Sequence, residues 1–146
     1  MPRLGEHPWL GAYAAPTVTP GGGSASAVAA ALGCALLAMA ARIGGRKAEP
    51  QQRDRLQWLA DEGERLRGAL VEQERADAGV YERMVATVRA ARATAGDPGA
   101  ERAAESARAD ATDVPLVTAE LAAEGLALAE ELVSMKLART VSDQLV

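Results

Sequence analysis

The sequence predicts an all-α fold, an antiparallel bundle of long helices that includes one buried, alanine-rich helix. Apolar residues make up 49% of the 146 residues, whereas aromatic residues make up only 3% and phenylalanine is absent. The core must therefore be built from Ala, Leu, Val and Met, which favours closely packed helices over a β-sandwich. No segment alternates apolar and polar residues as a half-buried strand does, and no internal repeat is present. The length fits one domain, residues 1–146.

Four helical segments are expected along the chain, each with its own boundary signals. Their approximate ranges are 3–14, 24–42, 50–94 and 100–138. Gly44-Gly45 ends the second segment, and a turn rich in Gly and Pro at 95–99 ends the third. Pro115 either kinks the last helix or divides it into two. The first segment is short and amphipathic, and its anchors are Leu4, Trp9, Leu10 and Tyr13.

The second segment is unusual because residues 24–41 carry no charge. It is nearly as long as a helix that spans a bilayer, which needs about 20 apolar residues. Alanine dominates it, however, and it contains two serines and a glycine. We therefore expect a helix buried on all sides within a soluble bundle, without a membrane partner. Its small residues allow close helix approach, either inside one chain or across a dimer interface.

The third segment carries an apolar stripe at steps of three and four, which is coiled-coil-like spacing. The stripe consists of Leu56, Leu59, Gly63, Leu66, Leu70, Gln73, Asp77, Val80, Met84 and Val88. Asp77 stands where an aliphatic residue is expected, and a carboxylate that faces a core is costly unless it is paired or used. Asp77 is therefore a candidate general acid–base group. The alternative, equally open from spacing alone, is an outward-turned Asp77 that is bridged to Arg75 or Arg83.

Residues 19–26 read Thr-Pro-Gly-Gly-Gly-Ser-Ala-Ser and lead directly into the alanine-rich helix. The glycines let a ligand or a neighbouring helix approach the backbone, and the first amides of the helix could bind a carboxylate or phosphate. The alternative is a plain turn in which Ser24 or Ser26 caps the helix. The pattern is neither a P-loop nor a dinucleotide fingerprint. After the helix, Arg42, Arg46 and Lys47 either compensate the helix dipole or form an anion clamp for a polycarboxylate.

Composition argues against several classes of function. The net charge of −4 and a pI near 5.1 disfavour nucleic acid as a partner. The single cysteine, Cys34, excludes an internal disulfide and fits a reducing cytoplasm, and the first residues contain no secretory signal. The only histidine, His7, offers little for a metal site, so we expect no metal and no redox cofactor.

Several motifs together resemble one family. Residues 19–27, the following alanine-rich helix and Gly45-Arg46-Lys47 resemble the cyclodeaminase domain of formimidoyltransferase-cyclodeaminase. They equally resemble the stand-alone bacterial methenyltetrahydrofolate cyclohydrolases of the same family. Residues 77–81 are similar to the family's Asp-Ala-x-x-Phe/Tyr segment. Val114-Pro115-Leu116 and Ser142-Asp143 match two later segments in the same order.

The resemblance implies an all-helical enzyme, a homodimer or a higher homo-oligomer, that acts on one-carbon derivatives of tetrahydrofolate and uses no other cofactor. It implies either a cyclodeaminase or a cyclohydrolase, with Asp77 as the catalytic residue. A non-catalytic helical dimerisation module, derived from such an enzyme, is the alternative. Members of the family continue beyond the Ser-Asp pair, so residues 1–146 are expected to lack the last two helices. The expected substrate-binding residues, from the motifs and from the spacing around Asp77, are Pro20, Gly21, Gly22, Gly23, Ser24, Arg46, Lys47, Gln73, Tyr81, Ser142 and Asp143.

Overall fold

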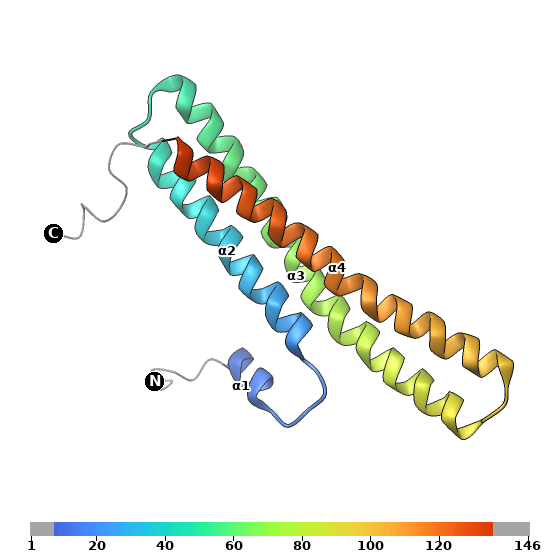
Figure 1. Cartoon of the computed structure of the whole chain (residues 1–146). Helices are drawn as coiled ribbons and strands as arrows, with labels where there is room; N and C mark the ends of the chain where they lie inside the picture. The colour runs from blue at the N-terminus through green and yellow to red at the C-terminus, as the bar shows by residue number, and fades with distance from the viewer. Residues whose placement is uncertain (1–7, 136–146) are drawn as a thin grey trace. The chain divides into compact units, whose positions relative to one another are not determined.

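The computed structural model describes residues 8–135, and these residues form four α-helices and no strand. The helices are α1 (Pro8–Ala14), α2 (Gly22–Gly45), α3 (Pro50–Ala93) and α4 (Pro98–Ser134) (Figure 1). The all-α prediction is confirmed. The boundaries of α3 agree with the sequence signals to within a residue. Pro115 lies inside a single α4, so the last segment is one helix rather than two.

The chain divides into two compact units, which we describe separately. The first unit holds the chain up to residue 27 together with residues 72–118. The second unit holds residues 28–71 and the chain from residue 119. Whether the chain is one domain, as the length suggests, stays a prediction.

The second unit has a core of leucine and alanine, as the composition predicts. Leu56, Leu59, Leu66 and Leu70 of α3 are all fully buried, which confirms the first half of the predicted stripe. Gly63 has a steric role there, because a Cβ on it would lie 3.0 Å from the carbonyl oxygen of Cys34. α2 and α3 therefore approach so closely that a larger residue at position 63 would force its neighbours to shift.

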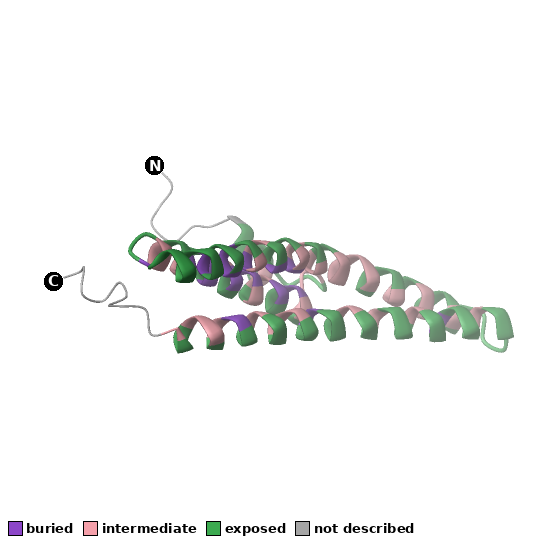
Figure 2. Cartoon of the chain, turned by 90° about the horizontal axis from the view of Figure 1, so that it is seen from above, coloured by how far each residue is buried: buried purple, intermediate pink, exposed green. Residues whose placement is uncertain are grey.

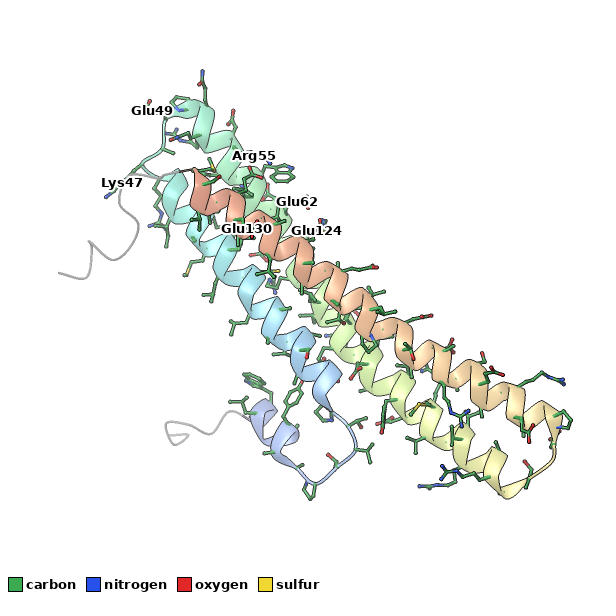
Figure 3. All side chains as sticks on the ribbon, in the orientation of Figure 1. Lys47, Glu49, Arg55, Glu62, Glu124 and Glu130 are labelled. Atoms are coloured by element: carbon green, nitrogen blue, oxygen red, sulfur yellow. The ribbon has the colours of Figure 1, made fainter. Side chains whose placement is uncertain are left out.

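Ion pairs between helices border this core. The guanidinium of Arg55 on α3 donates to both carboxylate oxygens of Glu131 on α4, with Nη2 2.7 Å from Oε2. Arg65 on α3 donates one hydrogen bond from Nη2 to Oε1 of Glu124 on α4, while its Nε donates to Glu62 on α3 itself. Figure 3 labels Arg55 and Glu124 on these two helices. Because all four side chains are substantially exposed, these ion pairs contribute little to the stability of the fold.

The expectation that the alanine-rich helix is buried on all sides is wrong for the single chain. Leu32, Leu36 and Met39 of α2 are 61%, 51% and 48% exposed. The described helices of the second unit cover only one face of α2, which has both buried and exposed positions. Figure 2 shows the same mixture of buried and exposed positions along the long helices. By length and a mean hydropathy of 1.9, α2 could cross a membrane. A core helix of a soluble protein passes the same test, so this is weak evidence of a span.

The first unit is less buried. Its segments of α3 and α4 are joined by a turn in which Gly96 adopts a positive φ of 89°, a conformation that favours glycine. The predicted stripe continues here through Asp77, Val80, Met84 and Val88, and all four are half-buried. The stripe is therefore a contact face without a closed core, and the polar residue within it remains accessible from outside.

Candidate functional site

Asp77 of α3 lies against the N-terminus of α2. Its Oδ2 atom accepts two hydrogen bonds from Ser24, one from the backbone N–H at 2.8 Å and one from the hydroxyl at 2.7 Å. Ser24 is fully buried, and its Oγ also lies 3.4 Å from the carbonyl oxygen of Glu74. The carboxylate of Asp77 is the nearer of the two acceptors and the charged one. The Ser24 hydroxyl therefore donates its hydrogen bond to Asp77 rather than to the carbonyl of Glu74. The first turn of α2 thus holds one oxygen of this carboxylate at a fixed position.

Gly23 explains why the glycine run precedes this helix. A Cβ on Gly23 would lie 2.6 Å from Cγ of Asp77, and closer still to its Oδ1. No residue with a side chain fits at position 23 while Asp77 keeps its place. The glycine therefore permits the approach of a side chain from α3, which is a close-approach role that the sequence alone left unspecified.

The other glycines have different surroundings. Gly21 accepts the first helical hydrogen bond, from Ala25 N–H at 3.0 Å, and therefore stands at the N-cap. A Cβ on Gly22 would meet nothing within 4 Å. Pro20, which precedes them, is half-buried and follows a cis peptide bond. Only Gly23 of the three is required by a neighbouring side chain.

Neither serine caps α2 as the sequence suggested. Ser24 donates to Asp77, and the hydroxyl of Ser26 donates back to the carbonyl oxygen of Gly22 at 2.9 Å. The free N–H of Ser24 is satisfied by Asp77, which comes from 53 positions further along the chain. The positive end of the helix dipole favours a carboxylate at this place. Gly21 occupies the N-cap position, and the side chain of Asp77 supplies the capping acceptor for α2.

The alternative in which Asp77 turns outward is excluded. Arg75 pairs instead with Glu72, at 2.8 Å, and no hydrogen bond or ion pair joins Asp77 to Arg83 within residues 8–135. Asp77 is half-buried and points at Gly23 and Ser24. The carboxylate on the apolar stripe is therefore directed inward and paired, as one of the two interpretations predicted.

The second oxygen of Asp77 is available. Oδ1 accepts no hydrogen bond from any residue in the described part of the chain, whereas Oδ2 accepts two. A carboxylate oxygen has lone pairs for further donors. One oxygen is thus fixed, and the other is free to take a proton or to face a positive charge.

Two residues that sequence reasoning missed complete this environment. The hydroxyl of Tyr13 on α1 donates to Oε1 of Glu74 at 3.3 Å. The pKa of Tyr13 is raised, and burial is the largest cause. The charge of Glu74, the hydrogen bond to Glu74 and the charge of Asp77 raise it further, in that order. The sequence pattern predicted Tyr13 only as an anchor of the first segment, and it did not single out Glu74. The phenolic hydroxyl of Tyr13 could have indicated this contact from the sequence, because a buried tyrosine hydroxyl usually has a hydrogen-bond partner.

The site is acidic. Glu74, Asp77 and Glu82 follow one another along α3, and within the described residues none of them forms an ion pair with Arg or Lys. The hydroxyl of Thr19 donates to Oε1 of Glu82 at 2.7 Å, so the loop before α2 also lies along this row. Unpaired carboxylates in one region attract positive charge. No group of three or more His, Cys, Asp or Glu between residues 8 and 135 could hold a metal ion.

Comparison with known proteins identifies the family. The chain matches the formiminotransferase-cyclodeaminase family over residues 7–146. It belongs to this family. No curated protein and no solved structure matched the chain. Membership of the formiminotransferase-cyclodeaminase family is compatible with a folate substrate, and it agrees with the resemblance seen in the motifs.

The expected site residues do not all come together in the structure. Gly23, Ser24 and Asp77 come together in the first unit. Gln73 lies one helical turn before Asp77 and is half-buried, and Tyr81 lies one turn after it and is 41% exposed. No hydrogen bond joins either of them to Asp77 in the part of the chain described. Arg46 and Lys47 are exposed and belong to the second unit.

The remaining members of the formiminotransferase-cyclodeaminase motifs fall elsewhere. Val114-Pro115-Leu116 lies within α4. Ser142 and Asp143 lie outside the described residues. The expected roles of the glycines, Ser24, Gln73, Tyr81, Arg46, Lys47, Ser142 and Asp143 in binding a substrate therefore stay predictions.

Proposed function

We propose that this chain catalyses carbon–nitrogen chemistry on the one-carbon unit of a tetrahydrofolate, as a formimidoyltetrahydrofolate cyclodeaminase. One observation carries the proposal. Asp77 presents a carboxylate with Oδ2 fixed by Ser24 and Oδ1 free, within a row of carboxylates that no cation neutralises in residues 8–135. Such a group is prepared to move a proton and to stabilise a cation.

The charge of the reacting group fits this surrounding. In a formimidoyl folate, the reacting carbon lies between two nitrogens and carries positive charge in its amidinium form. The carboxylates of Glu74, Asp77 and Glu82 attract that charge before and during the reaction. The same three carboxylates repel a further negative charge, such as a carboxylate of the substrate, at the glycine turn. We therefore assign the turn to the one-carbon end of the substrate rather than to the glutamate carboxylates.

The proposed reaction closes a ring and releases ammonia. The second folate nitrogen attacks the formimidoyl carbon, so that one carbon–nitrogen bond forms and the carbon becomes tetrahedral. Oδ1 of Asp77 takes the proton of the attacking nitrogen and gives it to the departing nitrogen. The bond to that nitrogen then breaks, which yields ammonia and the 5,10-methenyl product. Ser24 is a positioning residue in this scheme, because its two donors hold Oδ2.

Hydrolysis of the methenyl compound is the second candidate. Because Asp77 is only half-buried, water can reach its free oxygen, and the carboxylate could activate that water for attack on the methenyl carbon. Gln73 and Tyr81 lie one turn to either side of Asp77 on α3, where they could orient the substrate or the water. Both reactions need the same carboxylate, and an assay separates them.

The exposed apolar face of α2 supports a homodimer. Leu32, Leu36 and Met39 are about half exposed or more, and a contiguous apolar face of this kind commonly marks an interface. We place the protein in the cytoplasm, because its single cysteine, Cys34, is a free thiol that needs no oxidising compartment. Neither proposal is required for the role of Asp77.

The proposal is tested with Asp77→Asn, which keeps the shape of the side chain but removes its charge. Two absorbance assays are run, one for methenyltetrahydrofolate formation with ammonia release and one for its decay. Loss of one general acid–base group lowers a rate by roughly 10²–10⁴-fold. Asp113→Asn is the matched control, because Asp113 is exposed on α4. An unchanged rate in Asp77→Asn contradicts the proposed role.

The non-catalytic alternative makes a different prediction. If the wild-type chain is inactive in both assays, and 5-formyltetrahydrofolate does not raise its melting temperature, the chain is a helical module without folate chemistry. A ligand at 100 times its Kd stabilises the native state by about 2.7 kcal/mol, so binding is visible in a thermal melt.

A further inference from the structure

The N-terminal segment of the first unit supplies hydrogen-bond donors to two neighbouring carboxylates of α3. The Tyr13 hydroxyl donates to Oε1 of Glu74 at 3.3 Å. Ser24 donates to Oδ2 of Asp77, three positions further along α3. Each carboxylate therefore has one oxygen bonded to the N-terminal segment. Neither Oε2 of Glu74 nor Oδ1 of Asp77 accepts a hydrogen bond from a residue between 8 and 135.

Tyr13 is oriented at both ends of its side chain. Its ring meets the ring of Trp9 edge to face, with centroids 6.5 Å apart and an interplanar angle of 87°. Besides burial, the largest cause, the charges of Glu74 and Asp77 raise the pKa of Tyr13, so its hydroxyl lies within electrostatic range of both carboxylates. The bond to Glu74 is longer than the usual O–H···O distance of about 2.5–3.0 Å. It therefore orients Glu74 more than it stabilises the fold.

Glu74 departs from the charge pattern of its own helix. Three other glutamates of α3 each pair with an arginine three positions later. These pairs are Glu62–Arg65, Glu64–Arg67 and Glu72–Arg75. The residue three positions after Glu74 is Asp77, so two like charges are neighbours on the surface of the helix, which destabilises it. Within the described residues no Arg or Lys pairs with either of them. The amidinium of the proposed substrate carries the charge that would compensate this pair.

The proposed substrate also has a donor for each free oxygen. The amidinium of a formimidoyl folate ends in a nitrogen that carries N–H groups, and this nitrogen leaves as ammonia. A formyl group has nearly the same shape, but it places an uncharged oxygen acceptor there. The methenyl cation has no N–H on either nitrogen. A carboxylate oxygen beside the departing nitrogen therefore favours the formimidoyl compound over both relatives.

We propose that Glu74 is the residue that determines the specificity of this site for the formimidoyl group. Oε2 of Glu74 accepts a hydrogen bond from the departing nitrogen, while Asp77 moves the proton. Tyr13 is a positioning residue, because it holds Oε1 of Glu74. Because the departing nitrogen belongs to the proposed substrate, this role of Glu74 rests on the proposed function. The two carboxylates thus divide the work into recognition and proton transfer.

The first test measures binding without turnover. In the Asp77→Asn background, isothermal titration compares 5-formimidoyltetrahydrofolate with 5-formyltetrahydrofolate. The formimidoyl compound is expected to bind about 10- to 100-fold more tightly, because the formyl oxygen cannot donate a charge-assisted hydrogen bond. Glu74→Gln in the same background is expected to abolish this preference. Glu72→Gln is the matched control and should keep it, since Glu72 is 67% exposed and paired with Arg75.

The second test measures cyclodeamination. Glu74→Gln is expected to raise KM by about 10-fold or more while kcat changes much less, whereas Asp77→Asn lowers kcat. Tyr13→Phe should raise KM by about 2- to 5-fold, and it should add little to Glu74→Gln, because it acts through Glu74. The Tm of Glu74→Gln is expected not to fall, because glutamine keeps an acceptor for Tyr13 and removes one of two like charges. A merely structural role of Glu74 predicts a lower Tm instead.

The outcomes separate the role of Glu74 from the proposed function. If Asp77→Asn lowers the rate but Glu74→Gln keeps both the wild-type KM and the preference for the formimidoyl compound, the role of Glu74 is overturned and the proposed function stands. If the preference depends on Glu74 but the wild-type chain has no turnover, the proposed reaction fails and recognition by Glu74 stands. A chain that binds neither folate overturns both.

Discussion

Replacing Gly23 with alanine tests the close approach of Asp77 to α2. A Cβ at position 23 would lie 2.6 Å from Cγ and 2.8 Å from Oδ2 of Asp77, so the carboxylate must move. When it moves, Ser24 loses the acceptor of its N–H and of its hydroxyl in a fully buried position. The mutation therefore acts on two hydrogen bonds and on the position of the carboxylate together.

The magnitude follows from those donors. A buried donor left without an acceptor costs about 1–3 kcal/mol. The Ser24 hydroxyl retains the carbonyl of Glu74 at 3.4 Å, so the N–H bears most of the loss. Alanine recovers up to about 1 kcal/mol of helix propensity. The net destabilisation is therefore about 1 kcal/mol, which lowers Tm by roughly 2–4 °C in a chain of this length.

Gly22→Ala is the matched control, because a Cβ there meets nothing within 4 Å. Both variants are measured by urea unfolding and by the methenyltetrahydrofolate assays. Gly23→Ala is expected to lose stability and most of the activity, whereas Gly22→Ala keeps its stability. If the two variants behave alike in stability and rate, the argument that Gly23 makes room for Asp77 is refuted.

Two further predictions concern other contacts. Ionisation of Tyr13 would place a phenolate beside Glu74, and the pKa of Tyr13 is raised in the folded protein. Its hydrogen bond therefore stabilises the fold fully below the ordinary Tyr pKa of about 10. This stabilisation is lost as the pH rises through the higher pKa of the folded state. The stability difference between wild type and Tyr13→Phe in urea unfolding should therefore shrink above about pH 10, and a difference that stays constant through this range would contradict the role of the hydrogen bond. Gly63→Ala places a Cβ 3.0 Å from the Cys34 carbonyl and should cost about 1–3 kcal/mol in the same assay. Gly68→Ala, with nothing within 4 Å, should gain up to about 1 kcal/mol, and equal stabilities of these two variants would contradict the packing argument.

The periodicity of the sequence was sufficient to predict α3 and its buried face. Leu56, Leu59, Leu66 and Leu70 are buried where the steps of three and four place them. The same periodicity put Asp77 on the inner face, because a helix brings every third or fourth residue to one side. Local patterns of this kind depend on neighbours in the sequence, so the sequence is enough to predict them.

Contacts between distant segments could not be predicted in this way. Gly23 and Ser24 meet Asp77 across 53 positions, and nothing in a glycine run specifies which side chain will approach it. Tyr13 and Glu74 pair across 61 positions for the same reason. The burial of α2 was overestimated, because an uncharged helix does not reveal how much of its surface the other helices of one chain can cover.

The hydrogen bond from the Ser24 amide to Asp77 makes that amide a spectroscopic reporter. Its proton exchanges with solvent only when the carboxylate withdraws or when the first turn of α2 opens. A molecule that engages Asp77 will therefore alter the exchange rate and the chemical shift of this one amide. NMR of the buried Ser24 amide can thus report whether the Asp77 carboxylate is in place or displaced. The measurement needs no label on the ligand.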